Sequence, residues 1–133
     1  MSTRSFTLTE VIIVVIVIGI LVAFAMPQFR ATKERSLDKE AKAAVALIQA
    51  AEKIYKMEEG PYYPWPAGST SNITNINTWL KLSLPSSSGW TYVVDSANQQ
   101  ATATRNIAGG RTFTISFTSD AITCTPNSDT CPP

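Results

Sequence analysis

The sequence predicts an α+β protein in which one long N-terminal helix carries a small antiparallel β-sheet. Three observations predict this class. The run from Val11 to Met26 contains no polar side chain, residues 30–59 keep a helical apolar period, and short segments after residue 89 alternate apolar with polar residues. We expect the apolar half of the helix to be embedded in a membrane and the amphipathic half to pack on the sheet.

Composition narrows the classes of function. The chain has 133 residues, with 11 Lys and Arg against 10 Asp and Glu and no His. A net charge of +1 gives no basic excess for nucleic-acid binding. The lack of His removes the commonest general base and metal ligand, and no phosphate-binding glycine loop or activated nucleophile is recognisable. We therefore predict no enzyme, no metal, no cofactor and no nucleic-acid partner.

The first apolar segment, residues 6–29, is long enough to cross a bilayer. Phe6 to Met26 would form roughly 31 Å of helix at about 1.5 Å per residue, against a hydrocarbon core of about 30 Å. Glu10 is the exception within this segment, since a carboxylate at membrane depth costs about 2.5 kcal/mol or more and usually marks a functional pairing. We therefore expect Glu10 to have a partner.

The second segment, residues 30–59, predicts an amphipathic continuation of the same helix. No Pro or Gly interrupts it, and Gly60-Pro61 supplies a stop. An apolar stripe recurs at steps of four and three, and most charged residues are placed on the remaining, solvated circumference. The stripe is Leu37, Ala41, Ala44, Ile48, Ala51 and Tyr55; the charged residues are Lys33, Arg35, Asp38, Lys39, Glu40, Lys42, Glu52 and Lys53.

Residues 60–88 are rich in Pro, Ser, Thr, Asn and aromatic side chains, which predicts a long connecting loop. Its aromatic residues Tyr62, Tyr63 and Trp65 favour pinning of the loop to the core, with a ligand platform as the alternative. Asn72-Ile-Thr74 fits a glycosylation sequon, which is a weak signal.

Residues 89–122 predict three or four antiparallel strands. Apolar residues alternate with polar ones in three segments, and turn-forming residues separate the segments. The residues expected on one face are Trp90, Tyr92, Val94, Ala101, Ala103, Phe113, Ile115 and Phe117.

The two cysteines lie in the C-terminal segment 123–133. The spacing of Cys124 and Cys131 is unlike the paired spacing of a zinc or redox site, so a disulfide in an oxidising compartment is the favoured interpretation. The closed loop would contribute roughly 2.5 kcal/mol. Two free thiols are the alternative.

The N-terminus resembles that of a known family. Phe6-Thr-Leu-Thr-Glu10, the apolar run, Gly19 and the Pro27-Gln-Phe29 sequence are similar to the N-termini of type IV pilins and pseudopilins. The resemblance implies a leader of residues 1–5, cleavage by prepilin peptidase between Ser5 and Phe6, and N-methylation of Phe6. It implies a head of residues 30–133, whose C-terminal disulfide loop is also typical of pilins. Ser5 is a departure, because the family usually has Gly before the cut.

The resemblance also implies how the chain would polymerise. The new amine of Phe6 would pair with Glu10 of a neighbouring copy and set the axial register. Gly19 and Pro27 weaken the helix, and Pro27 lacks the amide that would bond to Ala23, so we expect a kink there and unwinding of the stretch between them in a filament.

The function predicted on this basis is that of a structural subunit of an extracellular type IV pilus-like filament, in adhesion or motility. Expected partners are copies of itself, prepilin peptidase, the assembly machinery and, before assembly, the inner membrane. The positive-inside rule, with Arg4 before the span and Arg30 after it, favours the opposite orientation. The expected cytoplasmic leader and the oxidising side required by the cysteines outweigh it.

Four alternatives remain open at this stage. A pseudopilin of a periplasmic type II secretion system is the first, although Asp120 and Asp129 are too few for a calcium cage. The second is a monomeric membrane-anchored domain with its ligand site at residues 62–65. The others are a simple single-span anchor and a secretory signal cut after Ala23-Phe-Ala25.

Overall fold

The computed structural model describes residues 7–86 and 89–125. The chain divides into two compact units, with the boundary between Ser36 and Leu37. In chain order the elements are α1 (Leu8–Glu59), β1 (Ser69–Thr70), α2 (Ile73–Trp79), β2 (Trp90–Asp95), β3 (Gln100–Arg105), β4 (Thr112–Ser116) and β5 (Ile122–Thr125). The α+β class predicted from the sequence is confirmed.

Helix α1 runs for 52 residues without a break, through Pro27. It ends where the sequence predicts, because Gly60 adopts a positive φ of 95° and its N–H donates to the carbonyl of Lys56 at 2.9 Å. A glycine at this position satisfies one of the last helical carbonyls in a backbone conformation that other residues rarely adopt.

The sheet has five strands in the order β1-β2-β3-β4-β5, and every neighbouring pair is antiparallel. The sequence predicted three or four strands. The additional ones are the two edge strands β1 and β5, which are two and four residues long. β1 is too short to show a period, and the alternation in β5 extends over only four residues, which is at the lower limit for detection from periodicity.

The two faces of the sheet differ in chemistry. The predicted inward face is buried along its full length, from Trp90 in β2 to Phe117 just after β4. The opposite face carries a row of threonines in register across four strands: Thr91, Thr104, Thr112 and Thr125. Their β-branched side chains suit a sheet surface, and the hydroxyls of Thr104 and Thr112 lie 3.1 Å apart.

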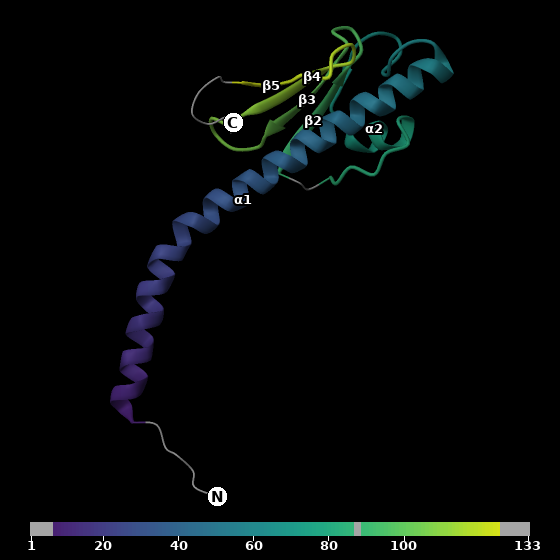
Figure 1. Cartoon of the computed structure of the whole chain (residues 1–133). Coiled ribbons are helices and arrows are strands. Elements are labelled where there is room, and N and C mark those ends of the chain that lie inside the picture. The colour runs from purple at the N-terminus through teal and green to yellow at the C-terminus, as the bar shows by residue number, and fades with distance from the viewer. Residues whose placement is uncertain (1–6, 87–88, 126–133) are drawn as a thin grey trace, which may run out of the picture. The chain divides into compact units, whose positions relative to one another are not determined.

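The core lies between the inward face of the sheet and the part of α1 that follows Leu37 (Figure 1). Small side chains on α1 bring the helix backbone close to the sheet, and larger ones fill the gaps. The buried apolar residues of the helix are Ala41, Ala44, Val45, Ile48 and Ala51, while Leu37 and Tyr55 are half-buried. The predicted stripe is therefore confirmed, with Val45 added to it.

The connecting region 60–88 contains α2, which sequence reasoning did not predict. Asn72 caps this helix: its side-chain oxygen accepts a hydrogen bond from the N–H of Asn75 at 3.1 Å. Ile76 is the buried residue of the helix and packs in the core. Seven residues are too few for a clear helical period, which is why only the cap could have signalled the helix.

Candidate functional site

The apolar segment of α1 is exposed along its whole length. Large hydrophobic side chains from Leu8 to Phe29 are all about half exposed or more, from 48% for Ile12 to 76% for Leu8. In composition and length this helix could cross a membrane, and none of its most apolar window is buried. An apolar surface of this extent marks a membrane or protein contact.

At the N-terminal end of this segment, Glu10 closes a capping box with Thr7. The N–H and the hydroxyl of Thr7 both donate to Oε2 of Glu10, at 3.0 and 2.9 Å, and the N–H of Glu10 donates to Oγ1 of Thr7 at 3.3 Å. These bonds satisfy orphan donors of the first turn, where the helix dipole also favours negative charge. The Thr-x-x-Glu spacing signals this cap, but sequence reasoning used Glu10 only as a charge.

Ser5 and Phe6, which flank the predicted cleavage site, lie outside the described residues, and so does the N-terminal partner predicted for Glu10. The Phe6–Glu10 pairing and the cleavage position therefore stay predictions. Glu10 itself is exposed at the N-terminal end of the apolar surface.

The structure keeps Gly19 and Pro27 in regular helix. A Cβ added to Gly19 would meet nothing within 4 Å, so its lack of a side chain is not required by packing within the chain. Helix α1 continues through Pro27, and the kink expected there stays a prediction. Unwinding of the stretch between the two residues was predicted for an assembled filament and stays a prediction.

The predicted disulfide is placed only in part. Cys124 lies in edge strand β5, opposite Phe113 of β4, and is not a free cysteine. Cys131 lies outside the described residues, so its pairing with Cys124 stays a prediction. The expected C-terminal loop accordingly begins with a strand, which ties its start to the sheet.

Two carboxylates predicted on the solvated face of α1 are buried, which corrects that prediction. Asp38 is 4% exposed and Glu52 is fully buried. Nε of Arg111 donates to Oδ1 of Asp38 at 2.6 Å, and the two side chains form an ion pair. Both positions continue the step of three or four residues through Ala41, Val45 and Ile48, which is the signal that sequence reasoning missed.

Glu52 has no such basic partner in the described part of the chain. Its Oε2 accepts the backbone N–H of Tyr63 at 3.0 Å, and its Oε1 has no hydrogen-bond partner. Burial raises the pKa of Glu52 to about 7, although the bond from Tyr63 opposes this shift.

The aromatic loop is pinned to the core, as the favoured interpretation predicted. Tyr63 is 7% exposed, and the ring of Tyr62 lies 4.9 Å from that of Phe117. Lys56 lies 4.2 Å from the centroid of the Tyr62 ring, in a cation–π contact. Trp65 is the exception and is 69% exposed.

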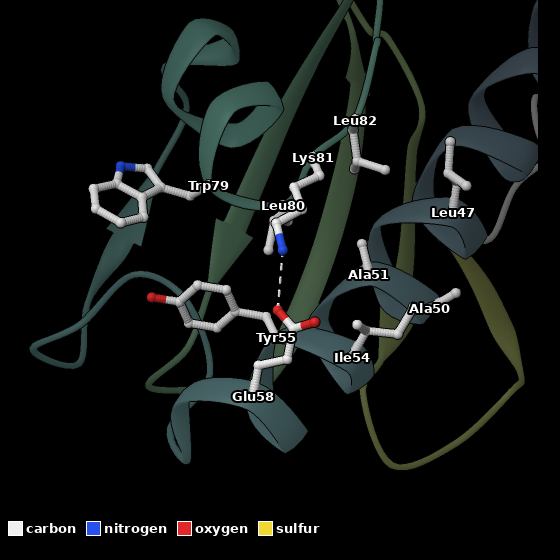
Figure 2. A pocket seen from close by; sticks show the side chains of 10 residues that line it. All are labelled: Leu47, Ala50, Ala51, Ile54, Tyr55, Glu58, Trp79, Leu80, Lys81 and Leu82. Atoms are coloured by element: carbon white, nitrogen blue, oxygen red, sulfur yellow. Dashed lines mark hydrogen bonds and ion pairs between the residues drawn. The ribbon is translucent and has the colours of Figure 1, made fainter.

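The head also carries a shallow groove of about 240 Å³ (Figure 2). Helix α1 forms one wall and the end of α2 with the following residues forms the other. An ion pair between Glu58 and Lys81, at 3.2 Å, joins the two walls. The lining residues are Leu47, Ala50, Ala51, Ile54, Tyr55, Glu58, Trp79, Leu80, Lys81 and Leu82. Across the described ranges, no group of three potential metal ligands occurs there or elsewhere.

A long apolar helix whose second half packs on a small antiparallel sheet is a pilin-like α+β architecture. Comparisons with known proteins agree. The chain is 42% identical over 59 residues to the type IV major pilin protein PilA of Myxococcus xanthus, covering 44% of this chain and 27% of that protein. It is 30% identical over 69 residues to the type II secretion system core protein G of Vibrio cholerae, covering 52% and 47%.

A third similarity is to the core protein G of Pectobacterium carotovorum, at 25% identity over 71 residues. The matched regions span half or less of the length of these curated relatives. No family model and no solved structure matches the chain significantly. Together with the fold, the similarities support the type IV pilin and pseudopilin family. Pilins are structural proteins without enzymatic activity, in agreement with the prediction from composition.

Proposed function

We propose that this chain is a structural subunit of a type IV pilus-like extracellular filament. The observation that carries the proposal is the long, uncovered apolar surface of α1 with the single carboxylate Glu10 at its N-terminal end. A membrane would cover this surface before assembly, and copies of the same helix would cover it in a filament.

In this proposal, prepilin peptidase in the inner membrane removes residues 1–5 and methylates the new amine of Phe6. The amine and the carboxylate of Glu10 are both costly in an apolar environment, and each lowers that cost for the other when they pair between copies. The remaining partners are the assembly machinery and other copies of the chain.

The first test is the intact mass and N-terminal sequence of protein recovered from sheared cell-surface material. A chain that begins at Phe6, carries one added methyl group and lacks two cysteine hydrogens is the expected result. A chain that begins at Met26 would make the segment a secretory signal, and an uncut chain confined to membranes would favour an anchored monomer.

A second test separates the charge of Glu10 from its capping role. Glu10→Gln keeps an oxygen that can accept the bonds from Thr7 but loses the charge, whereas Thr7→Val removes the hydroxyl of the cap and keeps the charge. We expect Glu10→Gln to abolish filaments and Thr7→Val to retain them, as measured by electron microscopy of sheared material. Normal filaments from Glu10→Gln would contradict the pairing.

The second candidate is a subunit of a periplasmic pseudopilus, supported by the similarity to the type II secretion core protein G of two species. A Cys124 that is not free favours the pilus instead, on the pattern of a C-terminal disulfide loop. Recovery of the processed chain from the periplasm only, with loss of protein secretion on its deletion, would select the pseudopilus.

A further inference from the structure

The contact between α1 and residues 60–66 contains a carboxyl group that neither filament assembly nor the sheet explains. Glu52 is fully buried there and accepts one hydrogen bond, from the N–H of Tyr63. Its second oxygen has no partner. An ionised carboxylate left with an unpaired oxygen in this position is costly, because it has lost water and gained only one donor.

Among the residues that the structure describes, the groups around Glu52 offer no positive charge to offset that cost. Its titratable neighbours are phenols, Tyr55 on α1 and Tyr63 on the loop. Burial is the main cause that raises the pKa of each; Glu59 and then Glu52 raise the pKa of Tyr55 further, and Tyr55 and then Glu52 raise that of Tyr63. Lys53 instead pairs with Asp120 at 3.2 Å, and Lys56 lies over Tyr62.

The other elements of the head add no cation to this contact. Within the described residues, Tyr92, Arg105 and Arg111 are ionisable side chains on the helix-facing side of the sheet. Arg105 lies over the ring of Trp90 and Arg111 pairs with Asp38, and α2 has no ionisable side chain. Because burial dominates, the pKa of Glu52 is raised to about 7. Neutral and charged forms of this carboxyl group therefore coexist near neutral pH.

Tyr63 connects this carboxyl group to the groove of Figure 2. Its ring lies edge-on to that of Tyr55, with centroids 5.8 Å apart, and stacks on that of Trp79 at 6.1 Å. Tyr55 and Trp79 both line the groove. The position of Tyr63 therefore supports side chains on both groove walls.

We propose that Glu52 is a proton-operated latch that holds residues 60–66 against α1 when its carboxyl group is neutral and releases them when it is ionised. The ionised carboxylate is stabilised by contact with water. Residues 60–66 are the segment that moves away to admit water, because they form neither helix nor strand, whereas α1 is regular helix. Release removes the support of Tyr63 from the groove, so the latch regulates that surface. The proposal does not depend on filament assembly.

Amide hydrogen exchange of the full chain in detergent micelles tests the latch. Protection factors corrected for intrinsic exchange are measured at pH 5.5 and 8.5 for the loop amides, above all that of Tyr63, which donates to Glu52, with β3 as the internal reference. A pKa of about 7 in the closed state and 4.5 in the open state corresponds to roughly 30-fold easier opening at the higher pH. We expect a loss of protection of that order in the loop and little change in β3.

Two variants test whether Glu52 causes the pH dependence of loop protection. Glu52→Gln, which stays neutral, should make loop protection independent of pH, whereas Glu40→Gln, on the exposed side of the same helix, should behave as the parent chain. A flat profile in the parent, an equal loss in β3, or a pH effect that survives in Glu52→Gln would each overturn the proposal. If Glu52→Gln fails to fold, an NMR titration of the parent chain tests the proposal instead. The chemical shifts of the Glu52 carboxyl carbon and of the Tyr63 amide proton should then change with the same pH midpoint. Separate midpoints would overturn the latch.

Discussion

The two halves of α1 differ in whether their apolar side chains are exposed or buried. From Leu8 to Phe29 the helix is almost entirely apolar and exposed, whereas after Leu37 it has fewer apolar residues and buries most of those on one stripe. The first half therefore leaves its apolar side chains exposed, while the second half obtains its cover from the sheet of its own chain. In the function proposed above, a membrane and then other copies cover the first half. Hydrophobicity along the helix is thus a poor guide to which residues stabilise the folded head.

A second difference concerns charge. The exposed half has its carboxylate at the helix end, where Thr7 caps it, but the buried half contains Asp38 and Glu52 within the core contact. Substitutions in the buried half should therefore change the free energy of unfolding of the head, and substitutions in the exposed half should not.

The largest expected effect is from Asp38→Ala. It removes the carboxylate that pairs with the guanidinium of Arg111, whose side chain is 11% exposed, and breaking a buried ion pair by removal of one member costs about 3–5 kcal/mol. Urea unfolding of the full chain in detergent, followed by tryptophan fluorescence, measures this cost. The double variant Asp38→Leu/Arg111→Met should recover most of it, and a cost below about 1 kcal/mol for Asp38→Ala would contradict the buried pair.

Removal of a matched isoleucine from each half tests the comparison directly. Ile48→Ala should lower the free energy of unfolding by about 2–5 kcal/mol, because the side chain is fully buried against the sheet. Ile16→Ala, at a position 56% exposed, should change it by less than about 0.5 kcal/mol. Equal costs in the same urea titration would show that the two halves do not differ as described.

The pH dependence of head stability follows from Glu52. Its pKa is raised from 4.5 to about 7 on folding, so the folded state holds a proton that the unfolded chain releases. Stability should therefore fall as pH rises from 4.5 to 7, by on the order of 2–3 kcal/mol, and level off above that. The pKa of Asp95 is lowered by hydrogen bonds from Asn98, so Asp95 changes the stability of the head only below about pH 4.

Denaturant midpoints measured from pH 4.5 to 8 in the full chain test this expectation. Glu52→Gln should flatten the profile, while Glu40→Gln should leave it unchanged. Stability that rises over this interval in the parent chain would contradict the assignment.

The smallest expected effect is at the surface of the head. Lys53 and Asp120 pair at 3.2 Å, with side chains 44% and 88% exposed, so Asp120→Asn should cost only about 0.2–1 kcal/mol. The cost should shrink further at high salt, which screens exposed charges. A cost as large as that of Asp38→Ala would erase the distinction between buried and surface charge.

The regular patterns in the chain were sufficient to predict most of the fold. Alternation in WTYVV and TFTISF, the stop at Gly60-Pro61 and the stripe through Ile48 each correspond to an observed feature. Helix α2 and the edge strands were missed because they are at or below the length at which a period can be detected. Ser5, Phe6 and Cys131 lie outside the described residues, so the predicted cleavage and disulfide rest on sequence and resemblance.

The sequence alone determined that the chain has a long apolar segment with one carboxylate near its start, and an amphipathic helix ahead of alternating strands. These are local patterns, set by the order of residues along the chain. Only the tertiary structure decided that Arg111 reaches Asp38, 73 positions away, and that Tyr63 covers Glu52. The burial and the pKa of a charged residue depend on which distant segments fold over it, and periodicity does not contain that information.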